Sequence, residues 1–180
     1  WITITGQTSP DTSGTVAYTV APNATASERT GTVLVGLQAV TVSQTANSLP
    51  QAQDSAISTD EDTPVSGQFA GTDLDGDPLT FSIVSNPSLG VATVTNAVTG
   101  AFVYTPNPDA NGSDTFTFQV SDGTATSSAA TVAIDITPVN DAPTATAAAA
   151  STTEDAAAPI TLVGADVDGD ALTFTIVNPP

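Results

Sequence analysis

Three aspartates at alternate positions lie in residues 72–81, which read TDLDGDPLTF. Asp73, Asp75 and Asp77 repel one another, because two charges about 4 Å apart interact by roughly 1 kcal/mol in bulk water and about 4 kcal/mol near a protein surface. Alternate side chains of an extended chain point the same way, and Gly76 allows a tight turn. Ca²⁺ takes about six to eight oxygen ligands at about 2.3–2.6 Å. The spacing therefore predicts a calcium site.

The same spacing recurs in residues 165–174, which read ADVDGDALTF. This second copy supplies three more acids, Asp166, Asp168 and Asp170. A glutamate precedes each copy at the same distance, Glu61 in the first and Glu154 in the second. An isolated Asp–Gly pair is also a frequent hairpin signal, so a single copy would indicate a turn. Duplication in register with an upstream glutamate favours ion binding.

The composition supports a hard cation as the partner. The chain has 19 acidic residues and one base, Arg29, with a formal net charge of −18. Such a field disfavours nucleic acid and anionic lipid. The absence of cysteine and histidine removes disulfides, thiolate metal sites and the commonest transition-metal ligand. An EF-hand is excluded, because Pro78 and Val84 occupy the positions of its glycine and final glutamate.

Short runs of β-branched and aromatic residues with a period of two fill most of the chain, separated by glycine, proline, asparagine and aspartate. This pattern is typical of strands, and many short strands predict β-sandwiches. The alanine run 147–150 lacks an apolar helical face and is expected in a linker or an edge strand. The sequence contains no run of 18 apolar residues, so it predicts no membrane-spanning helix. The first residue, Trp1, already lies in a predicted strand, so we expect an internal window of a longer protein.

An internal repeat sets the expected domain boundaries. The segment from Thr59 aligns without a gap with the segment from Thr152, at an offset of 93 residues. This period suits a seven-stranded sandwich of about 100 residues. We therefore expect an all-β linear array of tandem Ig-like domains, truncated at both ends. The expected parts are a partial domain over 1–46, a linker over 47–53, a complete sandwich over 54–139, a linker over 140–150 and the start of a second repeat over 151–180.

Two family resemblances cover nearly the whole chain. Residues 54–180 resemble the cadherin-like repeats (tandem-95 type) of very long bacterial surface adhesins, on the motifs EDTP, TDLDGDPLTF, FVYTPNPDANGSDTFTFQVSDG and VNDAPTA in that order. Residues 1–46 resemble the C-terminal half of a BACON domain, an Ig-like module of bacterial surface and secreted proteins. Eight residues carry that pattern: Trp1, Gly14, Tyr18, Asn23, Arg29, Gly31, Gly36 and Gln44.

The cadherin resemblance implies Ca²⁺ at the ends of the repeats and suggests its ligands. At the N-terminal end of the first full repeat these are Asp73, Asp75 and Asp122. At its C-terminal end they are Glu61, Asn140 and Asp141, which would meet Asp166 and Asp168 of the next copy. Asp77 and Asp170 have no counterpart in the cadherin pattern and are expected as ligands or turn formers. The acidic Asp-Arg-Glu triplet of cadherins is missing here, and Asp109 or Asp114 would take its place. Asp122 and Asn140 also suit plain turns, and the segment before Asp54 has no acid, which predicts a metal-poor first junction.

The resemblance implies a non-enzymatic spacer or adhesion segment of a large extracellular protein, stiffened by Ca²⁺ at its junctions. Two alternatives stay open, a glycan- or mucin-binding module and a subunit of an extracellular filament; a glycosidase is disfavoured, since the acids cluster at turns. Expected partners are calcium, glycans or other surface proteins and further copies, without nucleic acid or membrane insertion. Five aromatic residues are expected in the core, Phe81, Phe102, Tyr104, Phe116 and Phe118. Trp1 is expected in the core of the first domain, and the sequon asparagines Asn23 and Asn111 in turns.

Overall fold

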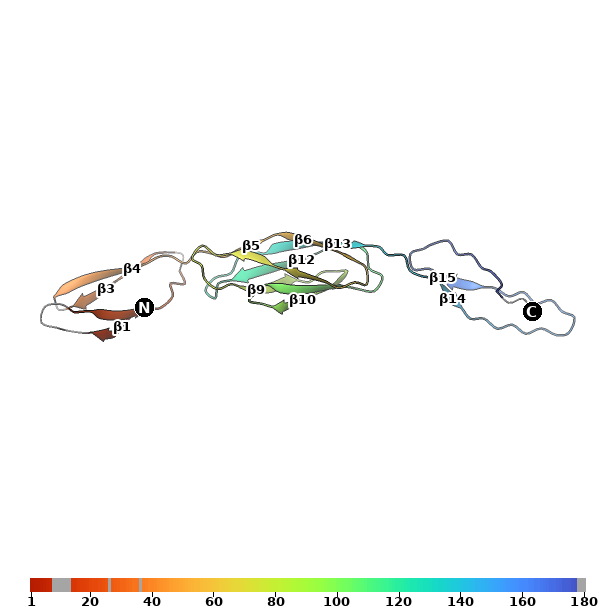
Figure 1. The fold of residues 1–180 in the computed structure, drawn as a ribbon, viewed down its shortest axis with the longest axis horizontal. Helices are drawn as coiled ribbons and strands as arrows, with labels where there is room; N and C mark the ends of the chain where they lie inside the picture. Colours follow the sequence, from red (N-terminus) through yellow and green to blue (C-terminus); the bar gives the residue numbers. More distant parts are fainter. Residues whose placement is uncertain (8–13, 26, 36, 178–180) are drawn as a thin grey trace.

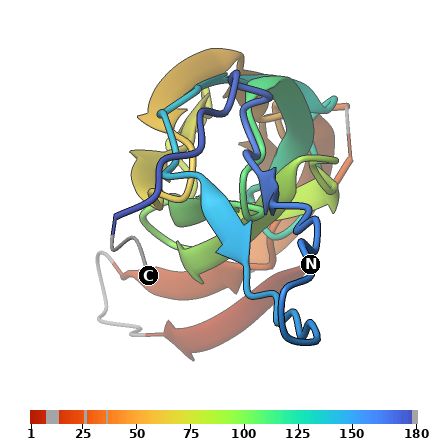
Figure 2. The ribbon, with the colours of Figure 1, turned by 90° about the vertical axis from the view of Figure 1, so that its right-hand side faces the viewer.

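The computed structural model describes residues 1–7, 14–25, 27–35 and 37–177, and these are all-β, as the sequence predicts. The strands in chain order are β1 Ile2–Gln7, β2 Val16–Val20, β3 Arg29–Val35, β4 Gln38–Gln44, β5 Gln51–Gln53, β6 Ser55–Asp60, β7 Val65–Gln68, β8 Ala70–Thr72, β9 Thr80–Ser85, β10 Gly90–Asn96, β11 Ala101–Pro106, β12 Gly112–Ser121, β13 Ala130–Thr137, β14 Thr144–Thr146 and β15 Val163–Ala165. They form three bodies in a line, and a view along the axis places these one behind another (Figures 1 and 2). Among the described residues there is no helix with the length and apolar character needed to cross a membrane.

The central body is a β-sandwich. One sheet has the order β10-β11-β7 and the other β6-β13-β12-β9, while β5 pairs with β8. The neighbours are antiparallel except β6 and β13, which run parallel. Along β13, buried and exposed residues alternate strictly, as expected for a strand with one face on a core and the other in solvent.

Aromatic side chains fill the core between the two sheets. All five aromatic residues expected there are buried, which confirms that prediction. Phe69 joins them, with its ring centroid 4.2 Å from that of Phe118 and 4.4 Å from that of Phe102. Gly67 makes room for this stack, since a Cβ there would lie 2.3 Å from Cζ of Phe102. The core fixes the two ends of the sandwich, where the acidic turns lie.

Two antiparallel strand pairs, β1-β2 and β3-β4, form the first body. Trp1 was expected in its core, and this prediction is wrong, because the residue is 36% exposed. Its ring instead lies 4.6 Å from the guanidinium carbon of Arg29, a cation–π contact. Gly31 allows this approach, since a Cβ there would lie 2.9 Å from Cζ2 of Trp1.

The structured parts extend into both expected linkers. β5 pairs with β8 and Ala52 packs against the aromatic core, so the central sandwich begins before Asp54. β14 likewise lies within the expected linker 140–150 and pairs with β15 of the second copy. The alanine run 147–150 belongs to neither a helix nor a strand. The second copy therefore adjoins the central sandwich through a short connection.

Candidate metal centre

The aspartates of the two copies form the same local turn. Oδ1 of Asp73 accepts hydrogen bonds from the backbone N–H groups of Asp75 (2.9 Å) and Asp77 (3.2 Å). Oδ1 of Asp166 accepts the equivalent bonds from Asp168 (3.1 Å) and Asp170 (3.2 Å). Gly76 and Gly169 have φ of 78° and 79°, a conformation that glycine adopts without a Cβ penalty. Only the first copy is packed in a sandwich, so the local sequence suffices to form the turn.

Asp73 also holds an unsatisfied oxygen. Its Oδ2 is buried and has no hydrogen-bond partner among the described residues. Carboxylate oxygens of Asp73, Asp75 and Asp77 can all lie within 4.8 Å of one another. A buried carboxylate oxygen without a partner is costly, and a cation would satisfy it. The three residues come from a single turn at the N-terminal end of the central sandwich.

The opposite end of the sandwich carries Glu61, which is 4% exposed. Its Oε1 accepts a hydrogen bond from the backbone N–H of Val139, and its Oε2 accepts one of 3.2 Å from Nδ2 of Asn111. The backbone N–H of Glu61 in turn donates to the carbonyl of Thr137 at 2.9 Å. These bonds fix a carboxylate at the end of β13, where the chain leaves the sandwich.

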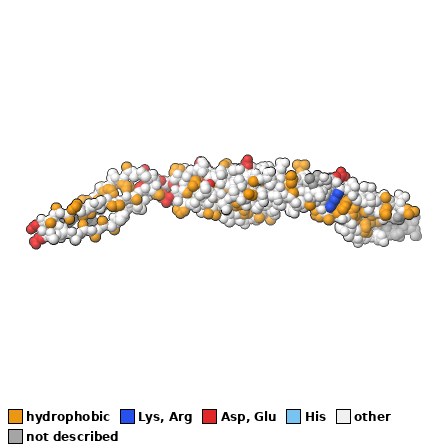
Figure 3. All heavy atoms as spheres, turned by 180° about the vertical axis from the view of Figure 1, so that it is seen from behind, with side chains coloured by type: hydrophobic (Ala, Val, Ile, Leu, Met, Phe, Trp, Pro, Cys, Tyr) orange, Lys and Arg blue, Asp and Glu red, His pale blue; other side chains and the backbone are white. Residues whose placement is uncertain are grey.

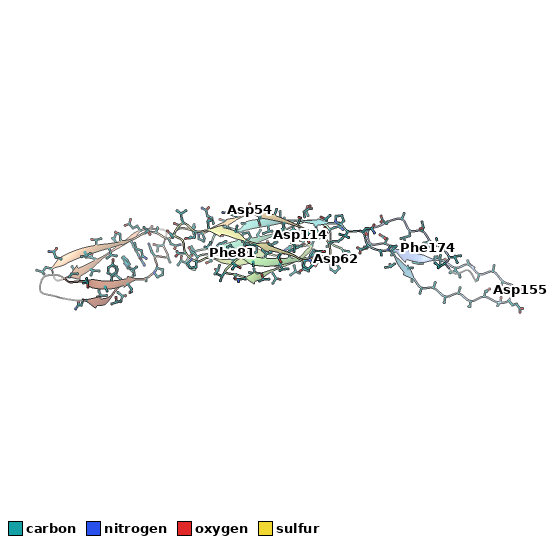
Figure 4. All side chains as sticks on the ribbon, in the orientation of Figure 1. Asp54, Asp62, Phe81, Asp114, Asp155 and Phe174 are labelled. Carbon is teal, nitrogen blue, oxygen red and sulfur yellow. The ribbon has the colours of Figure 1, made fainter. Side chains whose placement is uncertain are left out.

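Asp62, the next residue, has a left-handed backbone with φ of 57°. Asp109 has φ of 56°, and its backbone N–H donates a hydrogen bond of 3.2 Å to Oδ1 of Asp62. Among the described residues, Asp155 is the third non-glycine residue with a positive φ, at 60°. This conformation costs a side-chain-bearing residue on the order of 1 kcal/mol or more, and such strain gathers at functional sites. Figure 4 labels Asp62 at the C-terminal end of the sandwich and Asp155 at the far end of the last body.

Asp141 brings the carboxylates of this end together. Its backbone N–H donates to Oδ2 of Asp168 at 2.7 Å, which attaches the linker to the second copy. Two groups whose oxygens can lie within 4.8 Å of one another share it, Glu61 with Asp141 and Asp168, and Asp62 with Asp109 and Asp141. Oδ2 of Asp141 is buried and finds no hydrogen-bond partner in the described part of the chain. The central sandwich, the linker and the next copy thus each contribute a carboxylate.

Repulsion at this end changes the acidity of Asp141. Loss of hydration and the neighbouring negative charges of Asp109, Asp168, Asp62 and Glu61 raise the pKa of Asp141 above its ordinary value. The single base of the sequence, Arg29, belongs to the first body. In the view from behind, acidic side chains gather where the central and last bodies meet (Figure 3). No basic side chain among the described residues neutralises the carboxylates at this end of the sandwich.

The structure leaves several predicted ligands outside these groups. Asn140 bonds its own linker, with Nδ2 donating to the carbonyl of Asp141 at 2.8 Å. Asp166 uses Oδ1 for its turn, and Asp170 is exposed beside it. Glu154, the residue before Asp155, is exposed, and the described residues place it in no cluster of carboxylates.

Asp122 is buried and hydrogen-bonded. Its Oδ1 accepts bonds from the backbone N–H groups of Thr124 and Ala125, both at 2.6 Å, and from the Thr124 hydroxyl at 2.9 Å. Its Oδ2 accepts one of 2.8 Å from Nδ2 of Asn47. Burial alone would raise the pKa of Asp122, but the bonds from Asn47 and the loop hold it below its ordinary value. The geometry therefore favours the turn that its position before Gly123 also predicts.

The two residues considered as replacements for the missing triplet have different roles. Asp109 joins a carboxylate group, as described above. Asp114 is 5% exposed and lies in the sandwich, where the Tyr104 hydroxyl donates to its Oδ2 at 2.9 Å. Its other donors are the backbone N–H groups of Ser88, Leu89 and Thr115 and the Ser88 hydroxyl. Asp114 therefore holds the β9–β10 connection and is far from being a free ligand (Figure 4).

Sequence reasoning missed Asp62 and Asn111. Asp62 does not follow the alternate spacing of the aspartate motif, although Asp155 repeats it in the second copy. The left-handed backbone of both residues is the structural sign that the sequence could not show. Asn111 was singled out as a sequon, and its amide in fact orients Glu61. The other sequon residue, Asn23, is 6% exposed and donates from Nδ2 to the carbonyls of Ser27 and Thr45, which supports the turn reading.

The residues present fit a hard divalent cation. All donors are oxygens, most of them carboxylates, and Ca²⁺ prefers such ligands in flexible geometry. Two of the buried carboxylate oxygens, those of Asp73 and Asp141, have no partner among the described residues. Glu61 is held in place by two donors and still has lone pairs free.

The fold and these ends define an Ig-like β-sandwich domain with acidic turns. Residues 47–135 match the family model described as a bacterial Ig domain. Among solved structures, the chain is similar to two endo-fucoidan hydrolases of glycoside hydrolase family 107, at 21% and 19% identity with a TM-score of 0.41 for each. The matches cover 77% and 76% of this chain but 24% and 28% of the hydrolases. A human mucin-like protocadherin fragment, EC1-2, matches at 14% identity with a TM-score of 0.39, over 77% of this chain and 84% of that one. No curated protein sequence matches the chain.

Proposed function

We propose that this chain is a non-catalytic spacer segment of a bacterial surface or secreted protein, in which Ca²⁺ at the junction after the central sandwich fixes the direction of the next domain. The proposal extends the match of residues 47–135 to a bacterial Ig domain, a class typical of extracellular proteins. The finer assignments, to a tandem-95 cadherin-like repeat and a partial BACON domain, belong to the same proposal. Binding of glycans or other surface proteins and self-assembly remain predictions.

One observation carries the proposal. Carboxylates from three parts of the chain converge at one place, Glu61 from the sandwich, Asp141 from the linker and Asp168 from the second copy. Left alone, these like charges repel one another and push the parts they belong to away from one another. A bound divalent cation would supply the compensating charge, and Asp141 would hold it together with the other acids of either group that it shares.

Hydrogen bonds within the protein preorganise this site in the absence of an ion. The donors on Glu61 hold its rotamer, and the Asp109 amide holds the carboxylate of Asp62. Asp141 is attached to the second copy by its backbone, which leaves its side chain facing the other acids. The linker can therefore transmit the presence of an ion to the orientation of the next domain.

Small-angle X-ray scattering of the full chain tests this function. With millimolar Ca²⁺ we expect a narrow distribution of maximum dimensions that matches the linear arrangement of Figure 1. With chelator we expect a broader distribution, because the unneutralised junction becomes a hinge. Superimposable profiles in the two conditions would refute the proposal. Titration calorimetry should show binding in the range of extracellular modules, about 10⁻⁴–10⁻³ M.

A further inference from the structure

The two ends of the central sandwich join their neighbours through equivalent backbone contacts. The backbone N–H of Ser48 donates to Oδ2 of Asp75 at 2.5 Å, and that of Asp141 donates to Oδ2 of Asp168 at 2.7 Å. Both positions are related by the 93-residue offset of the repeat. The preceding asparagine also repeats, and in both linkers its Nδ2 donates to the carbonyl of the following residue. The two linkers therefore have the same local conformation.

The side chains at the two junctions nevertheless differ in kind. Ser48 stands where Asp141 supplies the carboxylate shared by both groups at the second junction. At the first junction, the three clustered carboxylates of Asp73, Asp75 and Asp77 all come from one turn of the central sandwich. A cation bound there would neutralise that turn but would not connect two domains. Something else must hold the first body against the sandwich.

Asn47 makes this connection through direct hydrogen bonds. Its backbone N–H donates to the carbonyl of Thr25 in the first body at 3.1 Å. Its Nδ2 donates to Oδ2 of Asp122 in the central sandwich at 2.8 Å and to the carbonyl of Ser48 at 2.9 Å. Asp122 is 8% exposed and is itself fixed by its loop, so it is a rigid acceptor.

A cavity beside Asn47, lined mainly by polar side chains, lies at this junction. The cavity has a volume of about 460 Å³ and is lined by Asn23 and Gln44 from the first body and by Asp77 and Thr124 from the sandwich. A hydrogen bond to a charged group contributes about 1.5–3 kcal/mol, more than a neutral one. The Asn47–Asp122 bond is thus a side-chain contact of this stronger kind at the first junction.

We propose that Asn47 fixes the first junction without a cation, so that the two ends of the sandwich respond differently to calcium. The first body and the central sandwich move as one unit, and the chain bends at residues 140–141 when calcium is removed. The expected bending of the second junction rests on the proposed function. The calcium independence of the first junction is a separate claim and is measured separately.

Double spin labelling of the full chain measures each junction, since the sequence has no cysteine to interfere. Thr32→Cys with Thr93→Cys spans the first junction, and Thr93→Cys with Thr161→Cys spans the second; all three positions are exposed. Pulsed electron paramagnetic resonance gives the distance distributions with Ca²⁺ and with chelator. For the first pair we expect the same mean and width in both conditions. For the second pair we expect broadening in chelator.

Three variants test the role of Asn47. Asn47→Ala should broaden the first distribution in both conditions and leave the second unchanged. Ser48→Ala is the matched control, because the bond to Asp75 uses the backbone N–H, and it should leave the first distribution narrow. Asn47→Asp places a carboxylate against Asp122 and should open the first junction in chelator at neutral pH. The circular dichroism melt of each variant shows whether the central sandwich remains folded.

The outcomes separate the two proposals. A first distribution that broadens on chelation of the unmodified chain, or that stays narrow in both Asn47→Ala and Asn47→Asp, would overturn the inference about Asn47. If the distance distribution of the second pair is the same with calcium and with chelator, the proposed function is wrong, and the inference about the first junction is unaffected.

Discussion

The backbone N–H of Asp141 donates a 2.7 Å hydrogen bond to the carboxylate of Asp168, a residue of the next repeat. This bond places the linker against the aspartate turn of that repeat, and it leaves the Asp141 side chain directed toward the acids of the central sandwich. The turn of the second copy has the same hydrogen bonds as that of the first, although residues 147–162 and 166–177 around it contain no described strand. The aspartate turn, which is the second repeat's part of the junction, therefore forms from local sequence without a complete domain around it.

Replacing Asp141 should weaken calcium binding more than any other single change at this junction, because both carboxylate groups share this residue. For Asp141→Asn we expect an affinity loss of about tenfold or more, since affinity follows the number of charged ligands. The ion-free domain should not lose stability, because the change removes repulsion. Calorimetric titration and a thermal melt in chelator measure the two quantities. Asp135→Asn, on an exposed position of β13, is the control and should bind calcium as before.

The left-handed backbone of Asp62 predicts that stability and binding respond differently to a glycine at this position. Glycine adopts φ of 57° without a Cβ penalty, but Asp62→Gly also loses the bond from Asp109 and makes the unfolded chain more flexible, so the ion-free chain should change in stability by less than about 1 kcal/mol. The same change removes a carboxylate from the site and should weaken calcium binding. Urea denaturation in chelator and in calcium measures both effects. Asp155→Gly relieves equivalent strain outside the described clusters, and a drop in affinity there would argue against this account.

The fold could be predicted largely from periodicity, because alternation of buried and exposed residues follows directly from strand geometry. β13 shows this alternation strictly. The pattern did not reveal Phe69, which lies in a short break between β7 and β8 and reaches the core through packing on distant strands. It also placed Trp1 in a core, whereas the ring lies on Arg29 at the surface. Both misses depend on contacts between segments that local spacing does not encode.

The candidate site was only partly predictable for a similar reason. The aspartate turns depend on side-chain bonds to backbone groups two and four residues away, so the sequence shows them. The meeting of Glu61 with Asp141 and Asp168 followed from the family resemblance, and the structure brings these three together. Asp62 contributes through a backbone conformation and a contact with Asp109 across 47 residues. No spacing rule on a single sequence predicts such a contact.

Acid should destabilise the central sandwich through Asp114. Burial alone would raise the pKa of Asp114, but hydrogen bonds from three backbone amides and the Tyr104 hydroxyl lower it below its ordinary value of 3.8. A lowered folded-state pKa means that the stabilisation is present above pH 3.8 and is lost as the pH falls through the folded value. Thermal melts in chelator between neutral pH and pH 2 should show this loss. Asp114→Asn should reduce the slope without abolishing it, because the pKa of Asp122 is also lowered, and an unchanged slope would contradict the role of Asp114.

Removal of one donor to Asp114 tests the same network at neutral pH. Tyr104→Phe keeps the buried ring and deletes the hydroxyl that donates to Oδ2 at 2.9 Å. We expect a loss of about 1.5–3 kcal/mol in the free energy of unfolding, as for hydrogen bonds to charged groups. Chemical denaturation measures it. Tyr18→Phe, on a half-exposed residue of the first body, should leave unfolding of the central sandwich unchanged.

The absence of a side chain at Gly67 should be required for the aromatic stack. A Cβ there would lie 2.3 Å from Cζ of Phe102 and within 2.9 Å of two further atoms of the same ring, which is enclosed by Phe69 and Phe116. Because the Phe102 ring is buried, Gly67→Ala should displace it and cost about 1–3 kcal/mol. Gly6→Ala is a fair comparison, since its nearest neighbour would be a methyl group at 3.8 Å. Equal stability of Gly67→Ala and the unmodified chain in urea would show that the ring can move at no cost, and that the two sheets are less tightly packed than this structure indicates.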